Sequence, residues 1–553
     1  MTVAFLTVIS FAVNAQTNVS GGIFSNTTWT LANSPYIVTD TVVVFPNVTL
    51  TIEPGVTVKF ADTQLLEIRQ AKLIAAGTAA DSITFTSNSL SPAPGIYSGI
   101  YLNGGTLTST FNYCNFIYAV FGIKITVSDS VIVNNSNFNF DSTGLQFIGI
   151  GIGSAQAAVI DNSIFMNNAN TGMNLQGLSS SKINYCNFIN NSYAGLILKD
   201  LQSGAMSLTM NHCNFSYNGA GLKWFLHSSV INNCHFSNNT SGIQVTDYLS
   251  HLDTYNNTAK NSVFDYNQTG FDGIGFTLID SCTVIHNQTG INSGVTNRIK
   301  NSTIDSNSVT GINVLNDSVI NCNIKYNGVG IHIPGASVII GNSIEYNTAA
   351  NISGASVSTT IKGNTIRYSN VGIDNITGNF LITENIIDNN NVGINLNSSN
   401  GTLSCNRICN NTTYDLSYGA VSNFNASNNY WCTPDSASTA AVIYDGYDNV
   451  SYGLVSFLPA DSTCYLNTGI SINEIRQFSA AVFPNPFNEQ LNIKIQSNEV
   501  SEFTLYDIAA KKLLQQKFTN SVSLNTGQIE KGIYIYEVRN KNGTSAKGKV
   551  IKL

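Results

Sequence analysis

Apolar residues recur at a regular interval through the middle of the chain. Each one closes a short polar stretch such as N-x-C-x-F, N-S-x-F or N-x-x-I, and it serves here as the anchor of one repeat. From Phe264 onward the anchors lie 20, 20, 20, 20, 22, 21 and 21 residues apart. A fixed period of this length predicts a solenoid, in which each repeat buries its apolar face against its neighbours. The anchors are Phe116, Phe138, Phe165, Phe188, Phe215, Phe236, Phe264, Val284, Ile304, Ile324, Ile344, Ile366, Ile387 and Ile408.

Two more columns keep register with the anchors. Asn follows three residues after the anchor in almost every copy: Asn168, Asn191, Asn218, Asn239, Asn267, Asn287, Asn307, Asn327, Asn347, Asn390 and Asn411. A Gly with an aliphatic neighbour comes next, at Gly195, Gly221, Gly242, Gly290, Gly311, Gly330, Gly372 and Gly393. We expect each Asn to bond its turn and the Asn of the next repeat. We expect the Gly residues to supply the positive φ of a corner.

Short strands, Gly turns and an Asn column at this period predict an all-β parallel β-helix, a solenoid of about 21-residue rungs. Stacked at the strand spacing of about 4.8 Å, fourteen rungs would form a rod of about 65 Å. A leucine-rich horseshoe is the alternative, but it requires an L-x-x-L-x-L spacing that this chain lacks.

The composition agrees with a β-rich fold and narrows the class of protein. Of 553 residues, 75 are Asn, 43% are hydrophobic and only 10% are charged. That hydrophobic fraction argues against disorder, and the scarcity of charge argues against a coiled coil. The net charge of −7 comes without a Lys/Arg run, so nucleic acid and anionic membrane are not expected as the main partners.

The first 15 residues, MTVAFLTVISFAVNA, predict a secretory signal peptide. An apolar core runs from Val3 to Val13, and Val13-x-Ala15 fits a small-residue cleavage site. The positive charge usual before the apolar core is missing, and a first buried strand is the alternative. No other stretch reaches the roughly 18 apolar residues of a membrane helix. We therefore expect export through the periplasm and no transmembrane segment.

The end of the chain has a different pattern from the repeats. Alternating strands separated by turn residues are predicted in LNIKI, FTLYD, GIYIYEV and VIKL. The segments VFPNPFNEQLNIKI, FTLYDIAAKKLLQQ and LNTGQIEKGIYIYEVRNKNG, closed by KGKVIKL, resemble the C-terminal sorting domain of proteins exported by the type IX secretion system of Bacteroidetes. Ala509-Ala510 departs from the Gly-bearing turn common in that family. The resemblance implies a small immunoglobulin-like β-sandwich over residues 481–553 that serves as an export address to the type IX machinery.

The segments that flank the repeats also resemble a known family. TWTLANSPYIVTDTVVVFPNVTLTIEPGVTVKF, KLIAAGTAADSITFTS and PGIYSGIYLNG are similar to the opening of bacterial right-handed β-helix proteins, and NNYWCTPDSASTAAVIYDGYDNVSYGLVSFLP to their end. The expected organisation is a signal peptide at 1–15, a cap with the first rungs at 16–105, and β-helix repeats with a C-terminal cap at 106–466. A linker at 467–480 leads to the sorting domain.

The ten cysteines fall into two groups. Six lie two residues before an anchor, in a column shared with Ser and, later, Asn: Cys114, Cys186, Cys213, Cys234, Cys282 and Cys322. Two positions from an inward anchor a side chain again faces inward, so we expect small buried thiols and no metal site. The remaining four, Cys405, Cys409, Cys432 and Cys464, cluster near the end of the repeats, where one or two disulfides are expected with the pairing open.

Two outward columns are candidates for chemistry. The residue after the anchor runs Asp265, Ile285, Asp305, Lys325, Glu345, Arg367, Asp388, and its alternating signs from Asp305 onward predict an exposed charge ladder rather than a catalytic pair. The next column carries Tyr217, Tyr266, Tyr326, Tyr346 and Tyr368, with His286 among them. Aromatic side chains along a rod suit a platform for sugar rings, and ladder packing at a corner is the alternative.

Three rungs are longer than the others, after Gly144, Gly195 and Gly242, and their insertions leave from the same side. The last insertion contains Asp247, His251 and Asp253, the weak candidates for catalysis; a solvated loop is the alternative. Arg298-Ile299-Lys300 resembles a triplet of polygalacturonases, but their NTD, aspartate-pair and GHG motifs are missing. We interpret the triplet as coincidental.

Three functions remain open for the sequence. The leading hypothesis is a secreted or outer-membrane-surface protein that binds extracellular polysaccharide, a cell-surface glycan or another surface partner without catalysis. The second is a polysaccharide lyase or glycoside hydrolase with its site in the groove beside the 246–260 insertion, using Ca²⁺ if it is a lyase and otherwise no cofactor. The third is a structural adhesin stalk.

Overall fold

The computed structural model describes residues 16–104, 107–126, 130–148, 157–177, 180–199, 207–225, 229–246, 257–273, 275, 277–294, 297–354, 358–464, 480–495, 500–507, 511–540 and 545–552. The chain divides into two compact units, residues 1–467 and 468–553. The predicted signal peptide and residues 467–479 of the predicted linker lie outside the described residues, as do Ala509 and Ala510.

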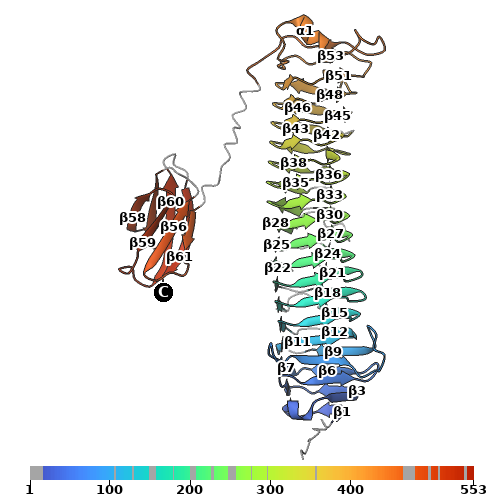
Figure 1. Cartoon of the computed structure of the whole chain (residues 1–553), viewed down its shortest axis with the longest axis vertical. Helices are drawn as coiled ribbons and strands as arrows, with labels where there is room; N and C mark the ends of the chain where they lie inside the picture. Colours follow the sequence, from blue (N-terminus) through green and yellow to red (C-terminus); the bar gives the residue numbers. More distant parts are fainter. Residues whose placement is uncertain are drawn as a thin grey trace, which may run out of the picture. The chain divides into compact units, whose positions relative to one another are not determined.

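The first unit is a right-handed parallel β-helix of about 16 turns, as the sequence predicts. Its rungs stack from β1 (Thr17–Ile23) at one end to β51 (Tyr414–Tyr418) and β53 (Ile443–Tyr444) at the other (Figure 1). Three parallel ladders form the walls of the rod. The first runs from β2 (Thr27–Trp29) to β49 (Gly401–Ser404), the second from β5 (Thr57–Phe60) to β50 (Arg407–Cys409), and the third from β6 (Leu65–Arg69) to β51.

The anchors stack in register inside the second ladder. Phe116 pairs with Phe138, and Phe138 with Phe165, so that equivalent side chains lie directly above one another. The rings from Phe116 to Phe264 are nearly parallel, with neighbouring centroids 4.5 to 5.1 Å apart. All fourteen anchors are buried. The rung spacing lies at the short end of the range of centroid separations that aromatic pairs prefer, so the rings stack without distorting the sheet.

The Asn column forms the predicted hydrogen-bonded ladder, and it is buried. In Asn218, for example, the backbone N and Nδ2 both donate to Oδ1 of Asn239, at 2.9 and 3.0 Å, and Nδ2 also donates to the carbonyl of Phe188 at 2.9 Å. A second ladder of the same kind occupies the inner column from Asn342 to Asn406. Each amide thus satisfies both its own polar atoms and a turn N–H that would otherwise be buried without a partner.

The predicted reason for the Gly column was wrong. None of its eight glycines has a positive φ; instead, a Cβ at Gly290 would lie 2.4 Å from the carbonyl oxygen of Gly311 in the next rung. Glycine is required there because successive backbones approach too closely for a side chain. Positive φ occurs at the residue two after the anchor, such as Tyr326 with φ 55°, and at the residue three before the anchor, such as Asn321, also with φ 55°.

The cysteines divide as the sequence predicts. Cys114, Cys186, Cys213, Cys234, Cys282 and Cys322 are free and buried. The pairing left open by the sequence is Cys405–Cys464 and Cys409–Cys432. Both bridges lie at the C-terminal end of the rod, where the last rung is also covered by α1 (Ser436–Ala441) and the buried Trp431.

The second unit is an antiparallel β-sandwich. One sheet contains β55 (Ala480–Phe483), β56 (Gln490–Ile495) and β59 (Ser521–Asn525); the other contains β57 (Ser501–Tyr506), β58 (Lys512–Phe518), β60 (Gly532–Asn540) and β61 (Ser545–Lys552). Buried apolar side chains from both sheets, among them Leu491, Ile493, Phe503 and Val538, form one core. The unit therefore has the hydrophobic core expected of a separate domain.

The Asn ladder begins with an acid. Asp141 occupies the Asn position of its rung: its Oδ1 accepts from the backbone N of Ala119 at 2.7 Å, and its own N donates to Oδ1 of Asn168 at 3.0 Å. Its Oδ2 is buried without a hydrogen-bond partner, at the place where the other members have a donating Nδ2. Burial raises the pKa of Asp141 well above its usual range.

We predict that Asp141→Asn increases the free energy of unfolding by about 1–3 kcal/mol at pH 8, because the amide carries at every pH the donor that the carboxyl gains only by taking up a proton. The folded protein keeps a proton on Asp141 that the unfolded chain releases above about pH 4, so the wild type loses stability as pH rises. The gain should therefore shrink toward pH 4. Urea unfolding followed by Trp fluorescence reports this unit alone, because Trp29, Trp224 and Trp431 all lie in it.

The matched control is Asn218→Asp, which places an acid in the middle of the ladder and should destabilise the protein most at high pH. An Asp141→Asn gain that is absent, or that is equal at pH 4 and pH 8, would show that Oδ2 is not a missing donor.

Candidate functional site

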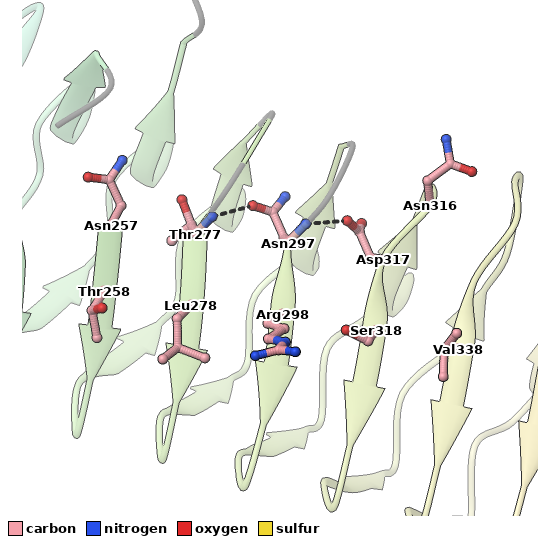
Figure 2. Close-up of a pocket in the computed structure, with 10 residues that line it drawn as sticks. All are labelled: Asn257, Thr258, Thr277, Leu278, Asn297, Arg298, Asn316, Asp317, Ser318 and Val338. Carbon is pink, nitrogen blue, oxygen red and sulfur yellow. Dashed lines mark hydrogen bonds between the residues drawn. The ribbon is translucent and has the colours of Figure 1, made fainter. Parts of the chain in front are cut away.

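A hollow of about 550 Å³ lies over five consecutive strands of the first ladder. The strands are β28 (Asn257–Lys260), β31 (Thr277–Asp280), β34 (Arg298–Lys300), β37 (Ser318–Ile320) and β40 (Val338–Ile340). Figure 2 shows the ten lining residues. They are Asn257, Thr258, Thr277, Leu278, Asn297, Arg298, Asn316, Asp317, Ser318 and Val338. We call this feature the β28–β40 hollow.

One rim of the hollow is a column of buried polar side chains at the starts of the strands (Figure 2). Oδ1 of Asn297 accepts from the backbone N of Thr277 at 2.9 Å, and Oδ1 of Asp317 accepts from the backbone N of Asn297 at 2.6 Å. Oδ2 of Asp317 accepts from the N of Leu315 at 3.2 Å. These side chains satisfy the backbone at the strand starts, so the rim is rigid and its carboxylate is already engaged.

The floor of the hollow is the outward column one residue further along each strand. The ladder register stacks Thr258, Leu278, Arg298, Ser318 and Val338 in that order. The side chain of Arg298 is exposed and forms no ion pair or hydrogen bond with any described residue, whereas that of Lys300 on the same strand pairs with Asp280 at 3.2 Å. The unpaired charge in the hollow is therefore the positive guanidinium of Arg298, a residue that the sequence analysis had set aside as coincidental.

The described lining of the hollow offers a limited set of chemical groups. Hydrolysis or elimination on a sugar chain needs a pair of carboxyl groups, or a base with metal ligands, converging on one point. Among its lining residues Asp317 is the one carboxylate and no His is present. Within the described parts of the chain, no cluster of three or more His, Cys, Asp or Glu is arranged to hold a metal ion. Hydroxyl, amide, apolar and guanidinium groups instead offer contacts to a polar ligand.

The predicted catalytic candidates Asp247, His251 and Asp253 lie outside the described residues. Asn257 and Thr258, near the C-terminal end of the 246–260 segment, line the hollow. The groove predicted beside this insertion stays a prediction. In the sequence, the hollow corresponds to a run of small outward-facing residues around Arg298. The same pattern occurs on an ordinary solvent-exposed face, so the sequence alone does not reveal the hollow.

The tyrosine column lies at a different corner, and its members are exposed. Tyr217, Tyr266, Tyr326, Tyr346 and Tyr368 have exposed fractions of 62, 59, 55, 40 and 42%. Tyr346 stacks between Tyr326 and Tyr368, with centroids 5.3 and 4.6 Å apart, and Tyr266 stacks on His286 at 5.0 Å. Stacked rings cover one another's faces and present edges and hydroxyls to solvent, so an open ring face exists only where the stack ends. Sugar binding by this column stays a prediction.

The adjacent charged column forms the predicted ladder. Lys325 pairs with Glu345 at 3.1 Å and Arg367 with Asp388 at 3.0 Å. Asp305 makes no ion pair with any described residue; its Oδ1 accepts from the hydroxyl of Ser306 at 2.6 Å. The alternation of charge is as predicted, but the exposure is not: Lys325, Glu345 and Arg367 are half-buried and Asp388 is buried.

Three family models match parts of the chain. "Right handed beta helix region" matches residues 98–259, "Pectate-lyase like beta helix domain" residues 21–115, and "Secretion system C-terminal sorting domain" residues 481–552. No curated protein matches the chain. None of the helices in the described residues has the length and hydropathy needed to cross a membrane.

Several solved structures are distantly similar. The periplasmic alginate epimerase AlgG is 12% identical, with a TM-score of 0.30, over 65% of this chain and 83% of that one. The mannuronan C-5 epimerase AlgE6 A-module of Azotobacter vinelandii is 14% identical, with a TM-score of 0.24, over 74% and 90%. The tailspike protein gp49 of Acinetobacter baumannii bacteriophage Fri1, a capsular polysaccharide depolymerase, is 11% identical, with a TM-score of 0.23, over 98% and 80%. These likenesses are too distant to bear on activity.

The hollow contains one group whose charge depends on pH in a testable way. Burial raises the pKa of Asp317 to about 6. The folded protein therefore holds a proton that the unfolded chain releases near pH 4, and the wild type loses stability between about pH 4 and pH 6. Relative to Asp317→Asn, we predict a loss of up to about 3 kcal/mol across this window, measured by urea unfolding with Trp fluorescence.

Asp280, on β31 two strands away in the same ladder, provides a control of opposite sign. Hydrogen bonds from Asn301, Lys300 and Ser281 outweigh its partial burial and lower its pKa. The wild type should therefore gain stability relative to Asp280→Asn as pH rises. If the difference in unfolding free energy between wild type and variant changed with pH in the same way for Asp317→Asn and Asp280→Asn, the assignment of a raised pKa to Asp317 would be contradicted.

Proposed function

We propose that this right-handed parallel β-helix protein, which carries a type IX secretion sorting domain, binds an extracellular polysaccharide in the β28–β40 hollow without cleaving it. The sorting domain indicates a secreted or cell-surface protein that engages the secretion machinery. The observation that carries the proposal is the guanidinium of Arg298, which has no partner among the described residues and lies in an open polar hollow whose single lining carboxylate is already bonded to the backbone.

The shape of the hollow favours a chain-like ligand. Five strands at the rung spacing extend roughly 20 Å along the rod, and each rung contributes one outward side chain to the floor at the same backbone position. A polymer of similar units can contact equivalent positions on successive rungs, whereas a compact metabolite would use only one or two. Thr258 and Ser318 offer hydroxyls at intervals along this floor, and Leu278 and Val338 offer apolar contacts to the C–H faces of sugar rings.

Arg298 is the expected centre of recognition. Its guanidinium presents donors in one plane, a geometry that suits adjacent hydroxyls or a carboxylate of a sugar. No described partner has to be displaced before it binds, so the interaction is not reduced by the loss of an internal ion pair. Hydrogen bonds to a charged group are worth about 1.5–3 kcal/mol, a tenfold or greater effect on affinity.

We predict that Arg298→Ala weakens binding to the preferred glycan by tenfold or more. The full chain is first tested against immobilised plant, algal and bacterial polysaccharides, and the affinity for the best ligand is then measured by calorimetry. The matched control is Lys362→Ala on β43 (Thr359–Lys362), which removes a positive charge from the same ladder outside the hollow.

Three results would overturn the proposal. The first is that no glycan is retained, and the second is that Arg298→Ala binds like Lys362→Ala and the wild type. The third is that incubation with the bound glycan releases shorter products, which would identify an enzyme instead of a binding protein.

A further inference from the structure

Between Tyr266 and Tyr368 the aromatic column is interrupted at one rung. Two residues after the anchor, successive rungs carry Tyr266, His286, Ser306, Tyr326 and Tyr346. Their φ angles lie between 53 and 58°, so each side chain leaves the same corner in the same way. The rings stack on both sides of the interruption, Tyr266 on His286 and Tyr326 on Tyr346, but a small Ser occupies the rung between.

The interruption leaves room for one ring. The anchors Val284, Ile304 and Ile324 pair in register, so the walls His286 and Tyr326 are two rungs apart, or roughly 10 Å. Tyr326 is 55% exposed, whereas Tyr346, covered on both faces, is 40% exposed. The difference agrees with an open face of Tyr326 toward Ser306. We call this space the Ser306 slot.

Polar groups are placed at one edge of the slot. The hydroxyl of Ser306 donates to Oδ1 of Asp305 at 2.6 Å. Lys325, the next residue of the charged column, pairs with Glu345, and Asp305 has no further partner among the described residues. Its carboxylate therefore keeps acceptor capacity for hydroxyl donors that enter the slot.

We infer that the Ser306 slot binds one pyranose ring of the same polysaccharide, inserted between His286 and Tyr326 with its hydroxyls donating to Asp305. The ligand class rests on the proposed function. A chair-shaped sugar ring has two apolar C–H faces and is thicker than a planar aromatic ring, so it fills the space between two aromatic walls at about 5 Å from each.

Ser306 lies on the same rung as Arg298, the central residue of the hollow. β34, which begins at Arg298, is followed along the chain by β35 (Thr303–Asp305), and Ser306 comes directly after β35. The slot is therefore a second point of attachment, around the corner from the first, and a ligand that occupies both would bridge two faces of the rod.

The decisive variant fills the slot with the side chain that the column uses elsewhere. Ser306→Tyr should stack between His286 and Tyr326 and fold normally, because Tyr already adopts the same positive φ in the next rung. We expect it to raise the thermal midpoint of unfolding and to weaken binding tenfold or more for the oligosaccharide of the best-retained glycan. Asn389→Tyr is the matched control: it adds a ring after Tyr368 in the same column, with φ 58° at Asn389, and closes no slot.

The outcomes separate this inference from the proposed function. If Ser306→Tyr binds like the wild type while Arg298→Ala does not, the slot is wrong and the hollow stands. If Ser306→Tyr weakens binding and Arg298→Ala does not, the slot stands and the hollow is wrong. Equal losses in Ser306→Tyr and Asn389→Tyr would overturn the slot, since only one of them fills it. Failure of the wild type to retain any glycan would overturn both.

Discussion

Parallel hydrogen bonding between consecutive rungs is the constraint on which the rest of the molecule depends. It stacks equivalent positions at about 4.8 Å, so whatever a residue does in one rung must be compatible with the same position above and below. Phe stacks on Phe, as in Phe116 and Phe138, and Asn bonds to Asn, as in Asn218 and Asn239. Gly faces Gly because the carbonyl of Gly311 leaves no room for a side chain at Gly290.

The same constraint explains why candidate function is found where a column changes. A residue that continues its column is held by its neighbours, whereas one that breaks the column leaves a group or a space without an internal partner. Arg298 interrupts a floor of Thr, Leu and Ser without gaining an ion pair from described residues, and Ser306 interrupts a stack of rings. Asp141 is the buried counterpart, where an acid at the start of the amide ladder leaves an oxygen unsatisfied.

Inward positions could be predicted from sequence, and outward ones only in part. The anchors, the Asn ladder and the six free thiols were all correct, because burial and stacking restrict those columns to a few residue types. The Gly column was placed correctly for the wrong reason, since sequence does not distinguish a positive φ from a close backbone approach. The sequence revealed the tyrosine column. It did not reveal that both faces of the Tyr346 ring are covered while Tyr326 keeps one open face.

By itself the sequence determined the fold class, the rung period, the inward columns and the sorting domain, because these follow from periodicity and from short motifs read along the chain. Only the tertiary structure decided which cysteines pair, Cys405 with Cys464 and Cys409 with Cys432, and where the surface is hollowed. The physical reason is that pairing and surface shape depend on how side chains from different rungs project into space. Outward columns tolerate many residue types, so their sequence carries little record of that geometry.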